Sequence, residues 1–185
     1  TGVQTCALPI CYTNRETTGI ETFKEEEFPD WKIKFFGKVK NSRRHKKYMD
    51  QLQKMIEDNG LHEQILFMGF SHNITEEYLH SEIVALPSYT EGFGYGLADG
   101  LALGLPGIGY EFAYGINHIL VNNKSGYLVK DINDMTIKLR LLMQNADLRR
   151  QMGKFARQDM DKYSAQKVID AWAELIDGVE SNANI

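Results

Sequence analysis

Apolar residues recur along this chain with two different spacings, and each spacing predicts one kind of element. Short apolar or alternating runs predict strands, whereas apolar residues three and four positions apart predict helices. The predicted strands span residues 31–37, 64–68, 83–86, 106–110 and 126–129. The predicted helices span residues 17–27, 42–59, 74–80, 116–121, 132–143, 146–163 and 164–176. Because strands alternate with helices, the pattern indicates an α/β domain in which helices cover both faces of a parallel sheet.

The most informative stretch follows the apolar strand at residues 83–86. Gly92, Gly94 and Gly96 predict a loop that folds tightly and lets a ligand approach the backbone. Apolar residues then keep a helical spacing until Gly104 stops the helix. The order is therefore strand, glycine loop, helix, and the unpaired N–H groups of such a helix N-terminus suit an anion.

Two carboxylates bracket this loop. Glu91 lies within it, and Asp99 lies about five residues into the helix, roughly 7–8 Å along the axis at 1.5 Å per residue. That is about the distance from a bound diphosphate to the ribose of the same nucleotide. A loop acid also favours a helix N-terminus by charge alone, and a helix acid is often only solvated. The pattern by itself leaves both structural roles open.

Length, charge and cysteine content narrow the functional classes. The 185 residues are enough for one domain with a sizeable core. The formal net charge of −4 argues against a nucleic-acid binder, which would normally carry a basic face. No apolar run is long enough to span a membrane, and Cys6 and Cys11 are too few for a disulfide scaffold.

Residues 1–10, Thr-Gly-Val-Gln-Thr-Cys-Ala-Leu-Pro-Ile, need separate treatment. They resemble the translation of a short-read sequencing adapter, and such segments are excluded from fold reasoning. A genuine N-terminus or a signal-peptide remnant are the alternatives. We expect this segment to be unpacked, the domain to span residues 11–178 without its first strand, and residues 179–185 to form a frayed tail.

Residues 87–94, Pro-Ser-Tyr-Thr-Glu-Gly-Phe-Gly, are followed by a second acid eight positions after the first. This pattern resembles the signature of family 4 glycosyltransferases, which have the two-domain GT-B fold and retain anomeric configuration. The resemblance continues through Gly-Leu-Pro at residues 104–106 and Lys-Ser-Gly-Tyr-Leu-Val at residues 124–129, and it covers most of residues 12–178. The family pattern has Glu where this chain has Asp99. The resemblance implies a Rossmann-like domain, the C-terminal half of a GT-B enzyme.

The resemblance also implies roles for individual residues. Glu91 would contact hydroxyls of the transferred sugar and is the expected catalytic residue. Asp99 would accept hydrogen bonds from the ribose, although Asp reaches about 1.5 Å less than Glu. Ordinary loop positions are expected for His72 and His118. The other donor-binding residues would offer backbone groups to the phosphates, sugar or base: Gly92, Phe93, Gly94, Tyr95, Gly69 and Phe70.

The implied activity is transfer of a hexosyl group, with retention, from a nucleotide-sugar such as a UDP-sugar to an acceptor hydroxyl in glycan or polysaccharide biosynthesis. This chain would be the donor-binding half, and a missing N-terminal domain would present the acceptor glycan or lipid-linked saccharide, so the chain alone should be inactive. No cofactor or metal is expected, because a helix dipole and basic side chains would stabilise the leaving diphosphate. One alternative is a degenerate, non-catalytic nucleotide-sugar-binding module, which Asp99 favours. An NAD-dependent enzyme is disfavoured, because the glycine spacing is not G-x-G-x-x-G.

A basic run extends from Lys38 to Lys47. It predicts a solvated loop and helix start, yet cations at a helix N-terminus oppose the macrodipole. Contact with an anionic membrane surface is therefore the alternative. We expect a cytoplasmic protein, and peripheral binding to the inner face of the membrane is the alternative location.

Overall fold

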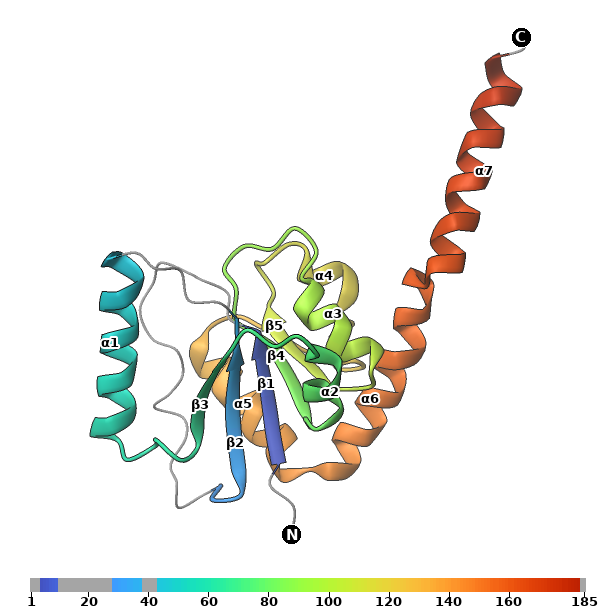
Figure 1. Cartoon of the computed structure of the whole chain (residues 1–185). Helices are drawn as coiled ribbons and strands as arrows, with labels where there is room; N and C mark the ends of the chain where they lie inside the picture. Colours follow the sequence, from blue (N-terminus) through green and yellow to red (C-terminus); the bar gives the residue numbers. More distant parts are fainter. Residues whose placement is uncertain (1–3, 10–27, 38–42, 184–185) are drawn as a thin grey trace.

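The computed structural model describes residues 4–9, 28–37 and 43–183. These residues form a six-stranded parallel sheet in the order β3-β2-β1-β4-β5-β6, flanked by helices (Figure 1). The strands are β1 (Gln4–Pro9), β2 (Trp31–Phe36), β3 (Ile65–Gly69), β4 (Ile83–Leu86), β5 (Gly107–Tyr110) and β6 (Gly126–Val129). The helices are α1 (Arg43–Asp58), α2 (Ile74–Leu79), α3 (Tyr95–Ala102), α4 (Ile116–Ile119), α5 (Ile132–Gln144), α6 (Ala146–Met160), the 3-10 helix η2 (Asp161–Tyr163) and α7 (Ala165–Ala183). The predicted α/β class is confirmed.

Most of the predicted elements that fall on described residues agree with the structure to within one or two positions. The helix predicted at residues 17–27 lies outside the described residues. The frayed tail predicted at residues 179–185 is contradicted as far as Ala183, because α7 continues to that residue, and residues 184 and 185 lie outside the described residues. The sequence of α7 contains no proline, and alanine, the best helix former, occurs four times in it, so the helix continues through Gly178.

The segment at residues 4–9 is a second correction. We expected it to be unpacked and the sheet to lack its first strand, but Gln4–Pro9 forms β1 in the middle of the sheet. It pairs with β2 from Gln4↔Trp31 to Pro9↔Phe36, and with β4 at Cys6↔Ile83 and Ala7↔Val84. An empty slot here would leave the facing N–H and C=O groups of β2 and β4 unpaired, and an extended segment satisfies them. Strand pairing says nothing about where the segment comes from, so its resemblance to an adapter stays a prediction.

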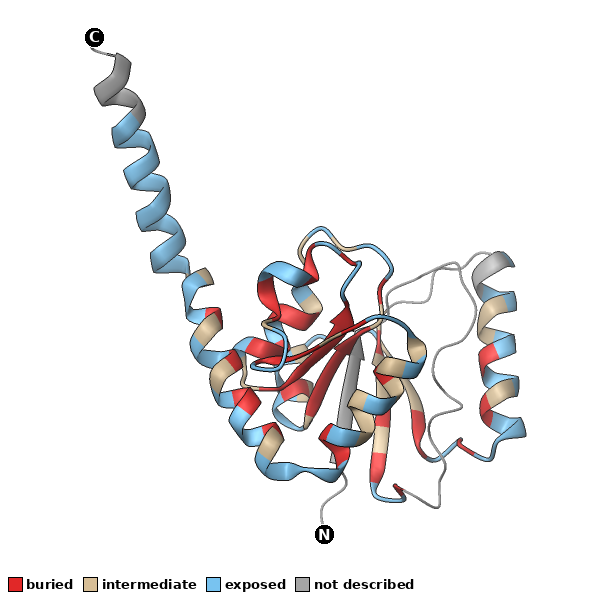
Figure 2. Cartoon of the chain, turned by 180° about the vertical axis from the view of Figure 1, so that it is seen from behind, coloured by how far each residue is buried: buried red, intermediate tan, exposed pale blue. Residues whose placement is uncertain are grey.

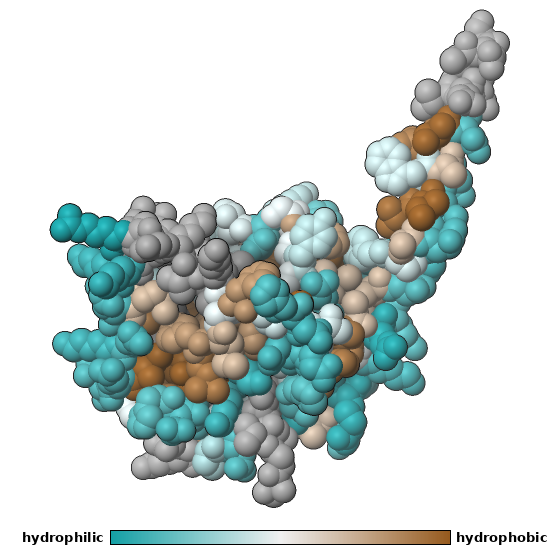
Figure 3. Space-filling view, viewed as in Figure 1, coloured by the Kyte–Doolittle hydropathy of each residue, from teal (hydrophilic) through white to brown (hydrophobic). Residues whose placement is uncertain are grey.

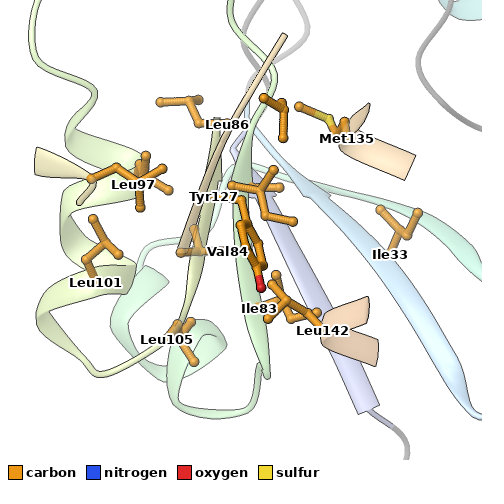
Figure 4. Close-up of a cluster of buried hydrophobic side chains, with 14 of the residues drawn as sticks. Ile33, Ile83, Val84, Leu86, Leu97, Leu101, Leu105, Tyr127, Met135 and Leu142 are labelled. Carbon is orange, nitrogen blue, oxygen red and sulfur yellow. The ribbon is translucent and has the colours of Figure 1, made fainter. Parts of the chain in front are cut away.

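Strand β4 carries the centre of the core. Its four residues are buried, because side chains on both faces of a parallel sheet are covered by helices. Leu97 and Leu101 of α3 lie on one side of the sheet, and Met135 and Leu142 of α5 lie on the other (Figure 4). The helix that follows β4 is therefore held firmly against the strand that precedes it.

A buried arginine joins α6 to the rest of the domain. The Arg149 side chain is 5% exposed, and its Nε donates to Glu82 Oε2 at 2.9 Å. Its Nη1 donates to the carbonyls of Leu142 and Met143 at 2.7 and 3.0 Å, and the guanidinium lies 5.1 Å from the Trp31 ring. Arg149 thus satisfies carbonyls at the C-terminal end of α5, which have no partner within their own helix.

Helix α7 leaves the sheet and extends away from it (Figure 1, Figure 2). Its described side chains are exposed from Ala165 to Gly178. The large apolar ones gather on one side of the helix (Figure 3) and are Val168, Ile169, Trp172, Leu175 and Ile176. Within the described part of the chain, no helix is both long and apolar enough to cross a membrane.

Candidate functional site

The strand order places a switch point at the carboxyl ends of β1 and β4. Both β1 and β4 are central, and the chain builds the sheet outward in opposite directions from them. In open parallel sheets of this order, ligands bind outside the carboxyl ends of the strands at that switch point. The loop after β4 begins at Pro87, so the glycine-rich motif lies at this place.

One glycine of the motif is required by its backbone conformation. Gly94 has φ 86° and ψ 50°, a left-handed conformation that side chains with a Cβ rarely adopt. It precedes Tyr95, the first residue of α3, and its carbonyl accepts hydrogen bonds from the Leu97 and Ala98 N–H groups. Gly92 has no such constraint, and a Cβ placed on it would meet no atom within 4 Å. The predicted tight turn is therefore located at Gly94.

The N-terminus of α3 has no side-chain cap and no acid in its first turn. Gly94 offers no side-chain oxygen to the N–H groups of Tyr95 and Gly96, which precede the first hydrogen bond of the helix, that from Leu97 to Gly94. These donors, with the positive end of the helix dipole, lie beside the exposed Gly92 and Tyr95. An anion is the ligand that this arrangement favours.

The two predicted acids lie on either side of this helix start. Glu91 is half-buried in the loop, and its main-chain oxygen accepts a hydrogen bond from the Gly115 N–H at 3.0 Å. Asp99 is the fifth residue of α3, about 6 Å along the axis from Tyr95 at 1.5 Å per residue. Its side chain is exposed, yet partial desolvation raises the pKa of the carboxyl above its usual value.

The residues predicted to lie against a nucleotide base are at the same edge of the sheet, but farther along it. Gly69 ends β3 with φ 70°, and Phe70 follows with 64% of its surface exposed. The Phe70 ring contacts His72 edge-on at 5.0 Å between centroids. Strands β2 and β1 separate β3 from β4. The structure thus puts Gly69 and Phe70 on the ligand edge without bringing them against the glycine loop.

Phe93 is held by aromatic neighbours. Its ring lies 5.0 Å from Tyr95 and 5.3 Å, edge to face, from Tyr163 of η2. The Tyr163 hydroxyl donates to the His118 carbonyl at 2.9 Å, so η2 joins the glycine loop to α4. The exposed His118 ring rests edge-on against Tyr114. Sequence reasoning missed Tyr163, because no local pattern links a residue after α6 to a loop after β4.

A second aromatic group lies at the carboxyl ends of β4 and β5. Tyr110 and Phe112 stack with ring centroids 4.8 Å apart, and Tyr89 lies within 5.5 Å of both. Burial, with smaller contributions from Tyr89 and Asp131, raises the pKa of Tyr110 to about 12. Its hydroxyl therefore stays protonated at neutral pH. The available signal for this group was an aromatic residue three positions after the predicted strand at residues 83–86 and two more at and just after the end of the predicted strand at residues 106–110.

The described residues contain no group of three or more His, Cys, Asp or Glu side chains arranged to hold a metal ion. Of the predicted basic run, Lys38 and Lys40 lie outside the described residues. Arg43, Lys46 and Lys47 are exposed in the first turns of α1.

Comparison with known proteins identifies the family to which this chain belongs. A family model described as glycosyl transferases group 1 matches residues 18–159. The chain is 29% identical over 129 residues to a poly(ribitol-phosphate) alpha-N-acetylglucosaminyltransferase of Staphylococcus aureus, a match that covers 68% of this chain and 26% of the relative. The chain spans between 15% and 41% of the length of the curated relatives it matches.

Solved structures share the fold. The C-terminal domain of a group 1 glycosyl transferase from Francisella tularensis superposes with a TM-score of 0.74 at 24% identity, covering 89% of this chain and 88% of that one. The Anabaena protein HepE, solved with UDP and glucose, superposes with a TM-score of 0.81 at 15% identity, covering 94% of this chain and 48% of that one. The architecture is that of a domain of GT-B glycosyltransferases, and the chain belongs to the group 1 glycosyl transferases.

Proposed function

We propose that this chain is the donor-binding half of a retaining family 4 glycosyltransferase that uses a UDP-sugar. The observation that carries the proposal is the uncapped N-terminus of α3 with Glu91 before it and Asp99 one turn inside it. This arrangement offers donors for a diphosphate and an acid on each side, at the edge of the sheet where ligands of such folds bind.

Each part of the donor has a partner in this proposal. The diphosphate lies against the backbone N–H groups of the glycine loop and of the first turn of α3. Asp99 accepts hydrogen bonds from the ribose, with the shorter side chain compensated by a closer approach or a bridging water. Glu91 contacts hydroxyls of the hexose, and the base lies along Gly69 and Phe70.

The reaction breaks the bond between the anomeric carbon and the diphosphate oxygen and joins the acceptor oxygen to the face of that carbon from which the diphosphate leaves. The proton of the acceptor hydroxyl passes to the leaving diphosphate oxygen. Charge develops on the diphosphate, where the positive end of α3 is already oriented. We propose that no metal or cofactor takes part. The UDP and glucose in the HepE structure support a UDP-sugar donor, and the S. aureus relative, named as an N-acetylglucosaminyltransferase, supports transfer of a hexosyl group.

The acceptor is the part of the proposal that reaches beyond this chain. The chain spans well under half of its curated relatives, so a further domain is proposed to present the acceptor glycan or lipid-linked saccharide across a cleft. Without that domain there is no near-attack geometry, a contribution that reaches about 7–11 kcal/mol. The alternative is a degenerate module that binds nucleotide-sugar without transferring it, and Asp99 in place of Glu is the observation that favours it.

Calorimetric titration of the 185-residue chain with UDP, UDP-glucose, UDP-N-acetylglucosamine and NAD tests the donor assignment. We expect saturable binding of the UDP compounds and none of NAD. Asp99→Ala should weaken binding of every UDP compound, whereas Glu174→Ala, an exposed acid on α7, should leave it unchanged. Equal binding of UDP by the Asp99 and Glu174 variants would refute the proposal that Asp99 contacts the ribose.

Peripheral membrane contact through the start of α1 belongs to the same proposal. The exposed Arg43, Lys46 and Lys47 face solvent where cations oppose the helix dipole, and anionic lipid would relieve that repulsion. Sedimentation with phosphatidylserine vesicles, compared with neutral vesicles, measures this contact. Equal recovery with both vesicle types would refute it.

A further inference from the structure

The glycine loop is held from outside by one close backbone contact. The Gly115 N–H donates to the Glu91 carbonyl at 3.0 Å. A Cβ on Gly115 would lie 2.5 Å from the Gly92 carbonyl carbon and 2.6 Å from the Glu91 and Gly92 oxygens. Real Cβ atoms essentially never come this close to backbone atoms. The two loops therefore touch main chain to main chain.

Glycine is needed at this position for space and not for conformation. Gly115 has φ −61° and ψ −28°, which any residue adopts. Alanine would fit the backbone of residue 115 but would push against residues 91 and 92. An added methyl group would thus act directly on the segment that carries the Glu91 side chain.

Gly115 is itself anchored in the core. It directly precedes α4, and the first residue of α4, Ile116, is fully buried. Ile116 packs so closely on β5 that a Cβ at Gly109 would lie 2.9 Å from its side-chain carbons. The side-chain amide of Asn117 closes the turn before Gly115, because its Nδ2 donates to the Glu111 carbonyl at 2.8 Å. The contact between Gly115 and Glu91 therefore fixes the position of the glycine loop relative to the sheet, because α4 packs on β5.

We propose that Gly115 is a positioning residue for Glu91, and that its contact with the backbone of residues 91 and 92 sets where the Glu91 carboxylate meets the hexose of the donor. This rests on the proposed function. The role differs from that of Asp99 or the α3 N-terminus, because displacing Glu91 changes the contact with the sugar while the nucleotide keeps its own partners.

The test compares dissociation constants for UDP-glucose and UDP in the 185-residue chain, measured by NMR titration. The quantity of interest is their ratio, Kd for UDP-glucose divided by Kd for UDP. Gly115→Ala should raise this ratio about tenfold, as should Glu91→Gln, while Kd for UDP changes less than about threefold. The double variant should show no larger effect than either single variant, because the two changes act on one contact.

Gly104→Ala is the matched control. Gly104 has φ 90°, which strains an alanine, and a Cβ there would meet only the Gly153 carbonyl oxygen at 3.6 Å and Arg157 Cβ at 4.0 Å, beyond the C-terminal end of α3, so the change destabilises the domain without touching the donor loop. It should leave the ratio at the wild-type value. If the Gly115→Ala variant does not fold, the test uses hydrogen exchange of the Gly115 backbone amide in the wild-type chain. UDP-glucose should slow that exchange more than UDP does.

The outcomes separate the two proposals. A Gly115→Ala variant that binds UDP and keeps the wild-type ratio overturns the positioning role, as does equal slowing of Gly115 exchange by UDP and UDP-glucose. Absence of UDP binding in the wild-type chain overturns the proposed function instead.

Discussion

Replacing Asp99 with alanine should slightly increase the free energy of unfolding of the free domain and weaken its binding of UDP. The carboxyl group is partly desolvated, which raises its pKa, so the folded domain disfavours the charged form. Its contribution to the free energy of unfolding is present below the ordinary pKa of 3.8 and is lost as the pH rises through the raised value. At neutral pH the ionised Asp99 therefore slightly destabilises the free domain.

The expected sizes follow from exposure and chemistry. Because Asp99 is exposed and alanine is the best helix former, the free domain should gain at most about 0.5 kcal/mol. That corresponds to about 1–2 °C in Tm for a domain of this size. Loss of a charged acceptor should weaken UDP binding by about 1.5–3 kcal/mol, roughly 10- to 150-fold.

Thermal denaturation with and without UDP measures both effects. At a UDP concentration ten times the wild-type Kd, UDP should stabilise the wild-type domain by about 1.4 kcal/mol, but a variant with tenfold weaker binding by only about 0.4 kcal/mol. Wild-type affinity should also fall as the pH is lowered through the raised pKa, since a protonated carboxyl loses acceptor capacity, and the alanine variant should lose this dependence.

Asp99→Glu is the conservative control and should keep UDP binding. A variant Asp99→Ala that is less stable than wild type, yet is stabilised equally by UDP, would refute the reasoning. It would mean that the carboxylate has a structural partner and no role at the nucleotide.

Four other changes test separate features of the molecule. In an enzyme that includes its acceptor half, Glu91→Ala should cut turnover about a hundredfold in a sugar-transfer assay, and an unchanged rate would contradict the catalytic assignment. Removing residues 1–9 should cost more than about 4 kcal/mol in urea denaturation, because β2 and β4 lose their shared partner; a Tm within a degree of wild type would contradict the central position of β1. Arg149→Met should cost about 3 kcal/mol, since the Met143 carbonyl loses the guanidinium donor and the Leu142 carbonyl keeps only the Asn145 N–H, and Glu82→Gln should cost much less in the same experiment. The exposed apolar side of α7 predicts self-association of the chain, which Trp172→Lys should reduce in sedimentation velocity; a monomeric wild-type chain or an unchanged distribution would contradict this.

Local spacing was enough to define the elements around the site. The apolar run at Ile83–Leu86 is followed by glycines and then by leucines and alanines at helical spacing, and each of these signals depends on neighbours in sequence. The alternation of strands and helices similarly predicted the parallel sheet. The position of Glu91 and Asp99 on either side of the α3 start followed from the same local pattern.

The wrong expectations concern what depends on partners distant in sequence. No periodicity marks Gln4–Pro9 as a strand, and it becomes one through the pairing it makes with β2 and β4. The end of α7 was predicted too early, because chain ends usually fray and because Val, Ser and Asn in residues 179–183 are weak helix formers that give no local sign that the helix continues.

The fold class, the glycine loop, the two acids and the family resemblance could be predicted from the sequence, because each is encoded by residue type and spacing over a short stretch. Three contacts could be found only in the folded chain: Gly115 touches the backbone at Glu91, Tyr163 packs on Phe93, and β1 lies between β2 and β4. These contacts join segments 20 or more positions apart in the chain. Their geometry is set by close packing of α4, η2 and the sheet, which no local pattern records.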